Sequence, residues 1–275
     1  MFTKNTGYYI FMVLSLVLIG LFVFFPLLWM LNTALKPSSE AFTLSFFQTF
    51  TLENFKNIIL DKQMMIYMKN SLVVSLISSL FATFVSSLAG YSFSKFRYRG
   101  RKFFMIMIMM SQAFPHVILL LTIYLVMKKF GLLDSYVSLV LSYVTFTLPM
   151  GTWTLKAYFD QIPNELLEAA KIDGANSLTI MRRVIFPLAV PGIISIAIYG
   201  FVWSWNDLLY SLTLITTASK RTLAPGLILT YMGEFQSNWT NMMAASIIVS
   251  IPVTLMFIFL QKYFIQGMTS GAVKG

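Results

Sequence analysis

Cysteine is absent from this chain of 275 residues, histidine occurs once, and only 11% of the residues are charged. The lack of Cys and His excludes disulfide frameworks, Cys/His zinc sites, thiol nucleophiles and the metalloprotease pattern that needs two histidines. The low charge argues against a soluble fold, since globular proteins carry about 25% charged residues. What is present is 57% hydrophobic, with 26 Phe and 18 Met. Too little polar surface remains to coat a soluble particle, so the composition predicts a membrane protein.

Apolar windows long enough to cross a bilayer recur along the chain. A membrane-spanning helix needs about 20 predominantly apolar residues, and one charge at its centre costs about 2.5–3.5 kcal/mol. Six windows of this length contain no Asp, Glu, Lys or Arg: 8–31, 70–94, 103–127, 135–155, 184–206 and 241–260. The sequence therefore predicts an all-α fold, a polytopic membrane bundle of six transmembrane helices. The first window is too long for the apolar core of a signal peptide, and we expect it to be retained.

Basic residues set the predicted orientation. With the N-terminus inside, the inside segments hold 12 of the 20 Lys and Arg, and the densest cluster lies in the short loop 95–102. Because basic residues concentrate in cytoplasmic loops, the topology is N-in/C-in. Aromatic residues within that loop would also suit single-stranded nucleic acid. Eight residues between two spans cannot form an extended groove, so we interpret the loop as an anchor against anionic membrane lipid and expect no nucleic-acid partner.

Two further patterns predict local structure in the first half of the chain. Apolar residues at helical spacing over 55–66, after a capping Thr51, indicate a helix on the outer surface. In the second span, Ala82, Ser86 and Gly90 recur four residues apart. Side chains this small predict a face for close helix packing.

The inside segment between the fourth and fifth spans is the most informative part of the sequence. Pro163 and Asn164 are helix-start signals, Gly174 is a stop signal, and a second short helix can begin at Ser177 and run to Pro187. The pattern predicts a cytoplasmic helix-turn-helix. The first of these helices, of about ten residues, is more apolar than an exposed loop should be, so we expect another protein to cover it, as when a helix docks in a groove.

This segment resembles a known motif. Glu168-Ala169-Ala170, three residues, Gly174, nine residues and then Val184-Ile185-Phe186-Pro187 is similar to the EAA loop of binding-protein-dependent ABC importer permeases. Val184 and Phe186 depart conservatively from the usual Ile-x-Leu-Pro ending. The run Trp205-Asn206-Asp207 and the ending 261–275 resemble the carbohydrate-uptake, maltose-permease type. The resemblance covers essentially the whole chain.

The resemblance implies a heteromeric sugar importer in a bacterial cytoplasmic membrane. Its partners would be a second permease subunit, two ATPase subunits, an extracytoplasmic solute-binding protein and the sugar. The chain itself would not be an enzyme and would bind no metal or cofactor, while the partner ATPase would use ATP and Mg. No Gly in the chain is followed by Lys, so it has no phosphate-binding P-loop of its own.

The same resemblance assigns site residues and regions. The residues implied to contact the ATPase through the coupling loop 160–187 are Glu168, Ala169, Ala170, Asp173, Gly174, Ala175 and Pro187. The residues implied to reach the ATPase from the C-terminal tail, 265–275, are Gly267, Gly271, Ala272, Val273 and Lys274. From its position near the outer end of the fifth window, and not from the resemblance, we expect Asp207 to form a gate or translocation path with Trp205 and Asn206, or to position the helix. Interfacial capping and direct sugar contact are the alternative roles of Asp207. The transmembrane core would be 70–264, preceded by the first span and outer loop, 1–69.

Two other transport classes compete with this interpretation. An ion-coupled secondary transporter needs ionisable groups near the membrane midplane. Only His116 qualifies, and its place after Pro115 favours a packing residue at a proline kink over a proton relay. An ABC permease for a non-sugar solute is the other alternative, and only the run 205–207 and the tail argue against it.

Overall fold

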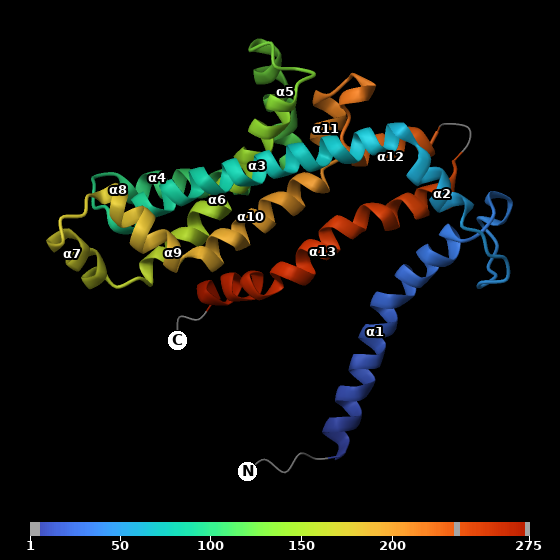
Figure 1. The fold of residues 1–275 in the computed structure, drawn as a ribbon, viewed down its shortest axis with the longest axis horizontal. Helices are drawn as coiled ribbons and strands as arrows, with labels where there is room; N and C mark the ends of the chain where they lie inside the picture. Colours follow the sequence, from blue (N-terminus) through green and yellow to red (C-terminus); the bar gives the residue numbers. More distant parts are fainter. Residues whose placement is uncertain (1–5, 234–236, 273–275) are drawn as a thin grey trace. The chain divides into compact units, whose positions relative to one another are not determined.

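The computed structural model describes residues 6–233 and 237–272 of the chain (Figure 1). Within these residues the secondary structure is helical, apart from one isolated antiparallel bridge between Met232 and Ser237. The prediction of an all-α fold is confirmed. The chain forms two units, one of Met1–Met64 with Leu227–Ile251 and one of Met65–Gly226 with Pro252–Gly275.

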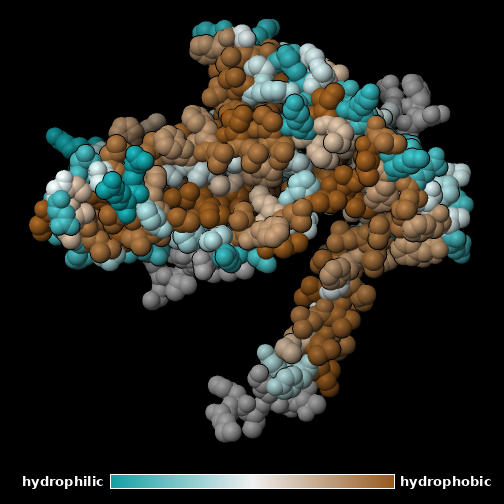
Figure 2. Space-filling model, viewed as in Figure 1, coloured by the Kyte–Doolittle hydropathy of each residue, from teal (hydrophilic) through white to brown (hydrophobic). Residues whose placement is uncertain are grey.

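The first unit begins with the long helix α1 (Thr6–Ala34). The most apolar part of this helix buries none of its residues inside the protein, and Figure 2 shows apolar side chains over most of its length. A helix that is apolar on all sides and uncovered is typical of a membrane span that faces lipid. The first predicted span is therefore present with nearly the predicted bounds.

Buried polar side chains hold the loop that follows α1. Lys36 is fully buried, and its Nζ donates to the carbonyl oxygen of Thr43 at 2.8 Å. The side-chain amide of Asn54 donates to the carbonyl oxygens of Ala34 and Lys36, both at 2.8 Å. These bonds tie the loop to α2 (Glu53–Leu60), the surface helix.

The predicted extent of the surface helix is wrong. The residue at the N-cap is Leu52, not the predicted Thr51, and the helix has no side-chain capping bond. The hydroxyl of Thr51 accepts from the backbone N–H of Glu53 at 3.1 Å in the preceding turn, and α2 ends at Leu60. Asp61 then accepts from the backbone N–H of Gln63 at 2.8 Å and starts a new helix, α3 (Lys62–Lys95). Residues from 62 onward, predicted to lie on the outer surface, therefore belong to the helix of the second span.

In the second unit, α3 packs closely with α6 (Tyr136–Asp160) and α10 (Val190–Trp205). Ala82 and Ser86 of α3 are fully buried. A Cβ atom added at Gly151 of α6 would lie 2.5 Å from the Oγ of Ser86 and 2.9 Å from Ile196 of α10. The predicted face of small residues on the second span is confirmed, and it brings three helices into contact.

Two of the predicted spans are broken into separate helices. The sequence indicated only a kink in the third span and a continuous helix in the fifth. The third window becomes α4 (Arg101–Met110), the short η2 (Ser111–Ala113) and α5 (His116–Lys129), bent by 105°. Phe114 takes an extended conformation because the ring of the following proline disfavours the helical one. The fifth window bends by 79° just before α10, which begins with Val190 and Pro191 in its first turn.

After α10 the described chain forms α11 (Leu209–Leu214), η4 (Ala218–Lys220), α12 (Leu223–Tyr231) and α13 (Trp239–Ala272). By length and composition, three single helices within the described residues can cross a membrane. The number of spans rises to five if each of the two bent helix pairs counts as one span. The helix α6, which contains the fourth predicted span, is not among them. It carries buried residues along its whole length.

The predicted C-terminal tail is helical as far as the structure describes it. The helix α13 continues past residue 260 to Ala272, so Gly267 and Gly271 lie within a helix. Val273 and Lys274 lie outside the described residues.

Candidate functional site

The segment between α6 and α10 forms a helix-turn-helix, which we call the elbow (residues 163–188; Figure 1). Its first helix, α7 (Asn164–Ile172), follows Pro163 and carries Glu165 in its first turn. Gly174 has a φ of +82°, a left-handed conformation that favours glycine. Its N–H donates to the carbonyl of Lys171 at 3.0 Å, and the N–H of Ala175 donates to that of Ala170 at 2.9 Å. These two bonds form a Schellman motif, which ends the helix.

The second arm of the elbow starts two residues later. The side chain of Asn176 accepts from the backbone N–H of Thr179 at 2.9 Å and caps α8 (Ser177–Ile180). A π-helical turn (Met181–Ile185) and the short α9 (Phe186–Leu188) continue the arm toward α10. The predicted start at Ser177 is confirmed, but the arm does not run straight into the fifth span, because the 79° bend intervenes.

One face of the elbow is anchored to the helices of its own unit. Leu167 of α7 and Ile180 and Ile185 of the second arm are buried in a hydrophobic cluster with Phe159 of α6 and Tyr91 of α3. The anchor also has a polar part, since Nζ of Lys95 donates to the carbonyl oxygen of Ile162 at 2.7 Å. A movement of the elbow would therefore be transmitted to α3 and α6.

The opposite face of the elbow is uncovered. Ile172 is 87% exposed and Leu178 is 59% exposed, and Figure 2 shows hydrophilic side chains beside apolar ones over α7 and α8. An apolar patch with a polar rim is typical of a protein interaction site. The coupling residues predicted from sequence that are exposed on the elbow are Glu168, Ala169, Asp173, Gly174 and Pro187. Ala170 and Ala175 are only partly exposed, because they pack against the elbow's own hydrophobic cluster.

The three residues predicted for a gate or translocation path have different surroundings. Trp205 is buried and stacks on Phe201, with ring centroids 5.5 Å apart. Asn206 is exposed, and its side chain donates to the carbonyl oxygen of Val202 at 2.8 Å. Asp207 accepts from the hydroxyl of Tyr143 and from the backbone N–H of Ser211, both at 2.9 Å. Asn206 and Asp207 line one end of a largely apolar groove of about 530 Å³ between α10 and α13.

Comparison with known proteins identifies the family. Residues 82–270 match the family described as binding-protein-dependent transport system inner membrane component. This chain belongs to that family. It is an ABC transporter permease, a multi-pass protein of the bacterial cytoplasmic membrane.

Relatives of the permease include proteins named for sugar uptake. The diacetylchitobiose uptake system permease protein DasC of Streptomyces coelicolor is 32% identical over 254 residues, which cover 91% of this chain and 92% of that protein. The trehalose/maltose transport system permease protein MalG of Thermococcus litoralis is 35% identical over 188 residues, 68% of each chain.

Solved structures share the fold of the permease. A chain of a bacterial ABC transporter involved in the import of alginate has a TM-score of 0.79 and 24% identity, with 96% of this chain and 100% of that chain covered. A chain from an alginate transporter in complex with an alginate pentasaccharide-bound periplasmic protein has a TM-score of 0.70 and 16% identity, with 92% and 91% covered.

His116 of the permease lies beside aromatic rings of α6 and α10. Its ring lies 4.6 Å from that of Phe146 and 5.8 Å from that of Trp203, measured between centroids. The backbone carbonyl of His116 accepts from the hydroxyl of Tyr210 at 2.6 Å. The predicted location at a proline break is confirmed, but His116 is exposed, so these two rings lie beside its ring without enclosing it.

Asp207 is expected to hold α6 against α11, since Tyr143 lies on α6 and Ser211 on α11. Replacing Asp207 by Ala leaves the hydroxyl of the fully buried Tyr143 without its acceptor, at a cost of about 1–3 kcal/mol. We expect Asp207→Ala to lower the Tm of the purified transporter, and Tyr143→Phe in the same chain to remove part of that loss. Asn206→Ala, at the exposed neighbour, should change the Tm little. A loss of uptake with an unchanged Tm would instead identify Asp207 as a gate.

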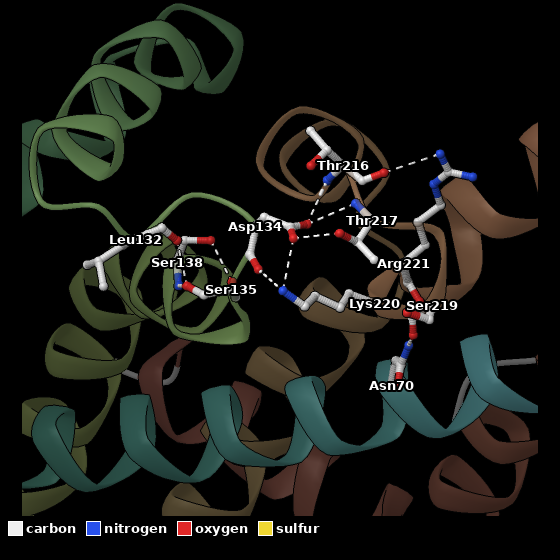
Figure 3. Close-up of polar contacts among 10 residues, drawn as sticks. All are labelled: Asn70, Leu132, Asp134, Ser135, Ser138, Thr216, Thr217, Ser219, Lys220 and Arg221. Carbon is white, nitrogen blue, oxygen red and sulfur yellow. Dashed lines mark hydrogen bonds and ion pairs between the residues drawn. The ribbon is translucent and has the colours of Figure 1, made fainter.

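A polar cluster that sequence reasoning missed joins two connections of the second unit (Figure 3). Asp134, in the turn before α6, accepts from the hydroxyl of Thr217 at 2.7 Å and from Nζ of Lys220 at 2.9 Å. From α3, the side chain of Asn70 donates to the carbonyl oxygens of Ser219 and Arg221, both at 2.9 Å. The segment between α11 and α12 is thus fixed from two sides. These residues form no recognisable motif because they are more than 80 positions apart in sequence.

The stability contributed by Asp134 is expected to depend on pH. The hydroxyl and N–H of Thr217, and then Lys220, hold the pKa of the Asp134 carboxyl well below its usual range. Because the pKa is lower in the folded state, the carboxylate stabilises the fold at pH values above the pKa of the unfolded chain, which is about 3.9. This stabilisation is lost as the pH falls through the pKa of the folded state. Asp134→Asn should therefore lower the Tm at neutral pH, by an amount that shrinks below about pH 4. Glu168→Gln, on the exposed face of α7, should show no such pattern, and a difference for Asp134→Asn that grows in acid would contradict the assignment.

Proposed function

We propose that this permease is one of two permease subunits of an ATP-driven importer that moves a sugar, an oligosaccharide or a related carbohydrate, by alternating access. The names of its relatives, which include uptake systems for diacetylchitobiose and for trehalose or maltose, support a carbohydrate as the substrate. A permease for a non-sugar solute is the alternative.

The observation that carries this proposal is the two-faced elbow. One face is fixed in the hydrophobic cluster with α3 and α6, while the other exposes Ile172 and Leu178. We infer that the exposed face docks in a groove of an ATPase subunit, with Glu168, Ala169, Asp173 and Gly174 at the contact. ATP binding by the partner would move the elbow and bias the helices toward the outward-open state, which the substrate-loaded binding protein also favours. ATP and Mg would be used by the partner, and this chain would not be an enzyme.

The topology that fits this role has six spans with both ends inside. It counts α6 as the fourth span and each bent pair as one span. The elbow then lies in the cytoplasm, where an ATPase can reach it, and the connections that contain Asp134 and Lys220 lie outside, on the side of the binding protein. The end of α13, with Gly267 and Gly271, would approach the ATPase from inside.

Co-purification from native membranes tests this function. A tagged permease is extracted gently, and stoichiometric partners are identified by mass spectrometry. We expect a second permease, a P-loop ATPase and a binding protein, and the binding protein can then be screened against sugars. A chain that comes out alone and transports after reconstitution without ATP would contradict the proposal. If the complex is complete but its binding protein binds only non-sugar solutes, the importer function would stand and the proposed carbohydrate substrate would be wrong.

A further inference from the structure

An open groove of about 710 Å³ lies at the junction of α3 and α4. The residues that line it are Arg97, Tyr98, Gly100, Arg101, Lys102 and Phe103. Three of these six carry a positive charge and two are aromatic. We call this the α3–α4 groove.

The positive charges of the groove are not neutralised within the described part of the chain. The two ion pairs found there, Lys156 with Asp160 and Lys220 with Asp134, lie elsewhere. The guanidinium of Arg101 donates to the carbonyl oxygen of Phe96 at 3.1 Å, a bond that leaves its charge unpaired. Clustered cations without carboxylate partners repel one another, so an anion in the groove would stabilise this part of the protein.

The start of α4 adds to the demand for an anion. Gly100, at the N-cap position, has a φ of +86° and no side chain to cap the helix, and the first turn contains no acidic residue. Arg101 and Lys102 instead place two cations at the positive end of the helix dipole, where anions are favoured and cations are not. The N–H of Arg101 donates to the carbonyl oxygen of Tyr98 at 3.4 Å, while the N–H groups of Lys102 and Phe103 are additional donors for an anionic oxygen.

The α4 surface next to the groove is apolar and uncovered. Four large side chains that are more than half exposed on this ten-residue helix are Phe103, Ile106, Met107 and Met110. A free anion such as inorganic phosphate could use the groove but would make no contact with this apolar surface. A ligand with an anionic head and an apolar tail satisfies both features.

We propose that the α3–α4 groove binds the phosphate headgroup of an anionic phospholipid, with the acyl chains along α4. Arg97 and Lys102 contact the phosphate oxygens, Arg101 adds charge at the helix start, and Tyr98 lies at the level of the headgroups. Such a site would keep the lipid bound to the purified transporter. The general enrichment of basic residues in cytoplasmic loops does not require a lipid to stay bound.

Lipid retention by the assembled transporter tests this site. The complex is reconstituted in nanodiscs of equimolar phosphatidylglycerol and phosphatidylcholine, released into detergent, and the retained lipids are counted by native mass spectrometry. We expect Arg97→Gln with Lys102→Gln to lower the apparent affinity for phosphatidylglycerol about twenty-five-fold, because each of the two basic residues near an anionic surface contributes roughly a factor of five. The matched control, Lys128→Gln with Lys129→Gln at the exposed end of α5, should retain the lipid as the unmodified complex does.

Two further arms separate the lipid from other ligands. Arg97→Lys with Lys102→Arg keeps the charge and should restore retention, which excludes misfolding as the cause of the loss. A photo-crosslinker in place of Phe103 should label phospholipid. Labelling of a protein subunit, competition by inorganic phosphate as strong as that by phosphatidylglycerol, or equal losses in the groove and control variants would each overturn the proposal.

Discussion

Replacing Gly174 by valine is expected to lower uptake at least about tenfold while the permease remains in the membrane in normal amount. The φ of +82° at this position is unfavourable for any L-residue by roughly 1–2 kcal/mol, and a β-branched side chain tolerates it least. No atom lies within 4 Å of a Cβ placed there, so the effect is on the backbone and not on packing. A strained turn would release the Schellman bonds and shift the exposed residues of α7 relative to those of α8.

The measurement is uptake alongside ATP hydrolysis by the same purified complex. We expect hydrolysis to continue without matching transport, since the elbow would no longer transmit closure of the ATPase to α3 and α6. A change of about 1.4 kcal/mol in that coupling already corresponds to a factor of ten.

Two controls isolate the backbone effect. Gly174→Asn should retain most of the uptake, because asparagine enters the left-handed region more readily than other residues. Gly131, outside the elbow, also has a positive φ, +66°, and open space around it, so Gly131→Val imposes a similar strain elsewhere and should be better tolerated. Normal, ATP-coupled uptake by Gly174→Val would show that this turn is not the coupling element.

Local signals in the sequence were enough to predict the elbow. Pro163 has no N–H and favours a helix start, and Gly174 adopts the left-handed turn that ends the helix. Both effects reach only a few residues along the chain, so the bounds of α7 can be predicted from the local sequence. Which face of α7 is free could not be predicted in the same way. That Leu167 is buried while Ile172 is exposed depends on the cluster with Phe159 and with Tyr91 of α3, and Tyr91 is remote in sequence.

The breaks in the third and fifth spans show the limit of composition. A charge-free window predicts that a segment prefers lipid, but it does not predict whether the helix inside it is straight. Pro115 indicated only a kink, whereas Phe114 is extended and the two halves meet at 105°. The Asp134 cluster was missed for a related reason: its hydrogen bonds join residues that only the fold brings together.

Replacing Gly151 by valine is expected to remove most of the permease from the membrane. A Cβ at this position would lie 2.5 Å from the Oγ of Ser86 and 2.9 Å from the Cγ2 of Ile196, so α3, α6 and α10 could not keep their present spacing. Overpacking of this kind costs about 1–3 kcal/mol or more, which is a large part of the stability of most folded proteins. Quantitative immunoblotting of membranes, with the Tm of any protein recovered, measures the effect.

Removing the obstructing side chain should reverse the loss. Ser86→Gly combined with Gly151→Val opens space where the new atoms must go, so we expect the double variant to regain much of its amount and its uptake. Gly20→Val, in α1, where nothing lies within 4 Å, should behave as the unmodified chain. A double variant as poor as the single one would contradict the steric explanation. The Gly151 variants act on the helices that anchor the elbow, and the Gly174 variants act on its free face. If the Gly151 variants lose protein from the membrane while the Gly174 variants lose only coupling, assembly and energy transmission depend on different parts of the permease.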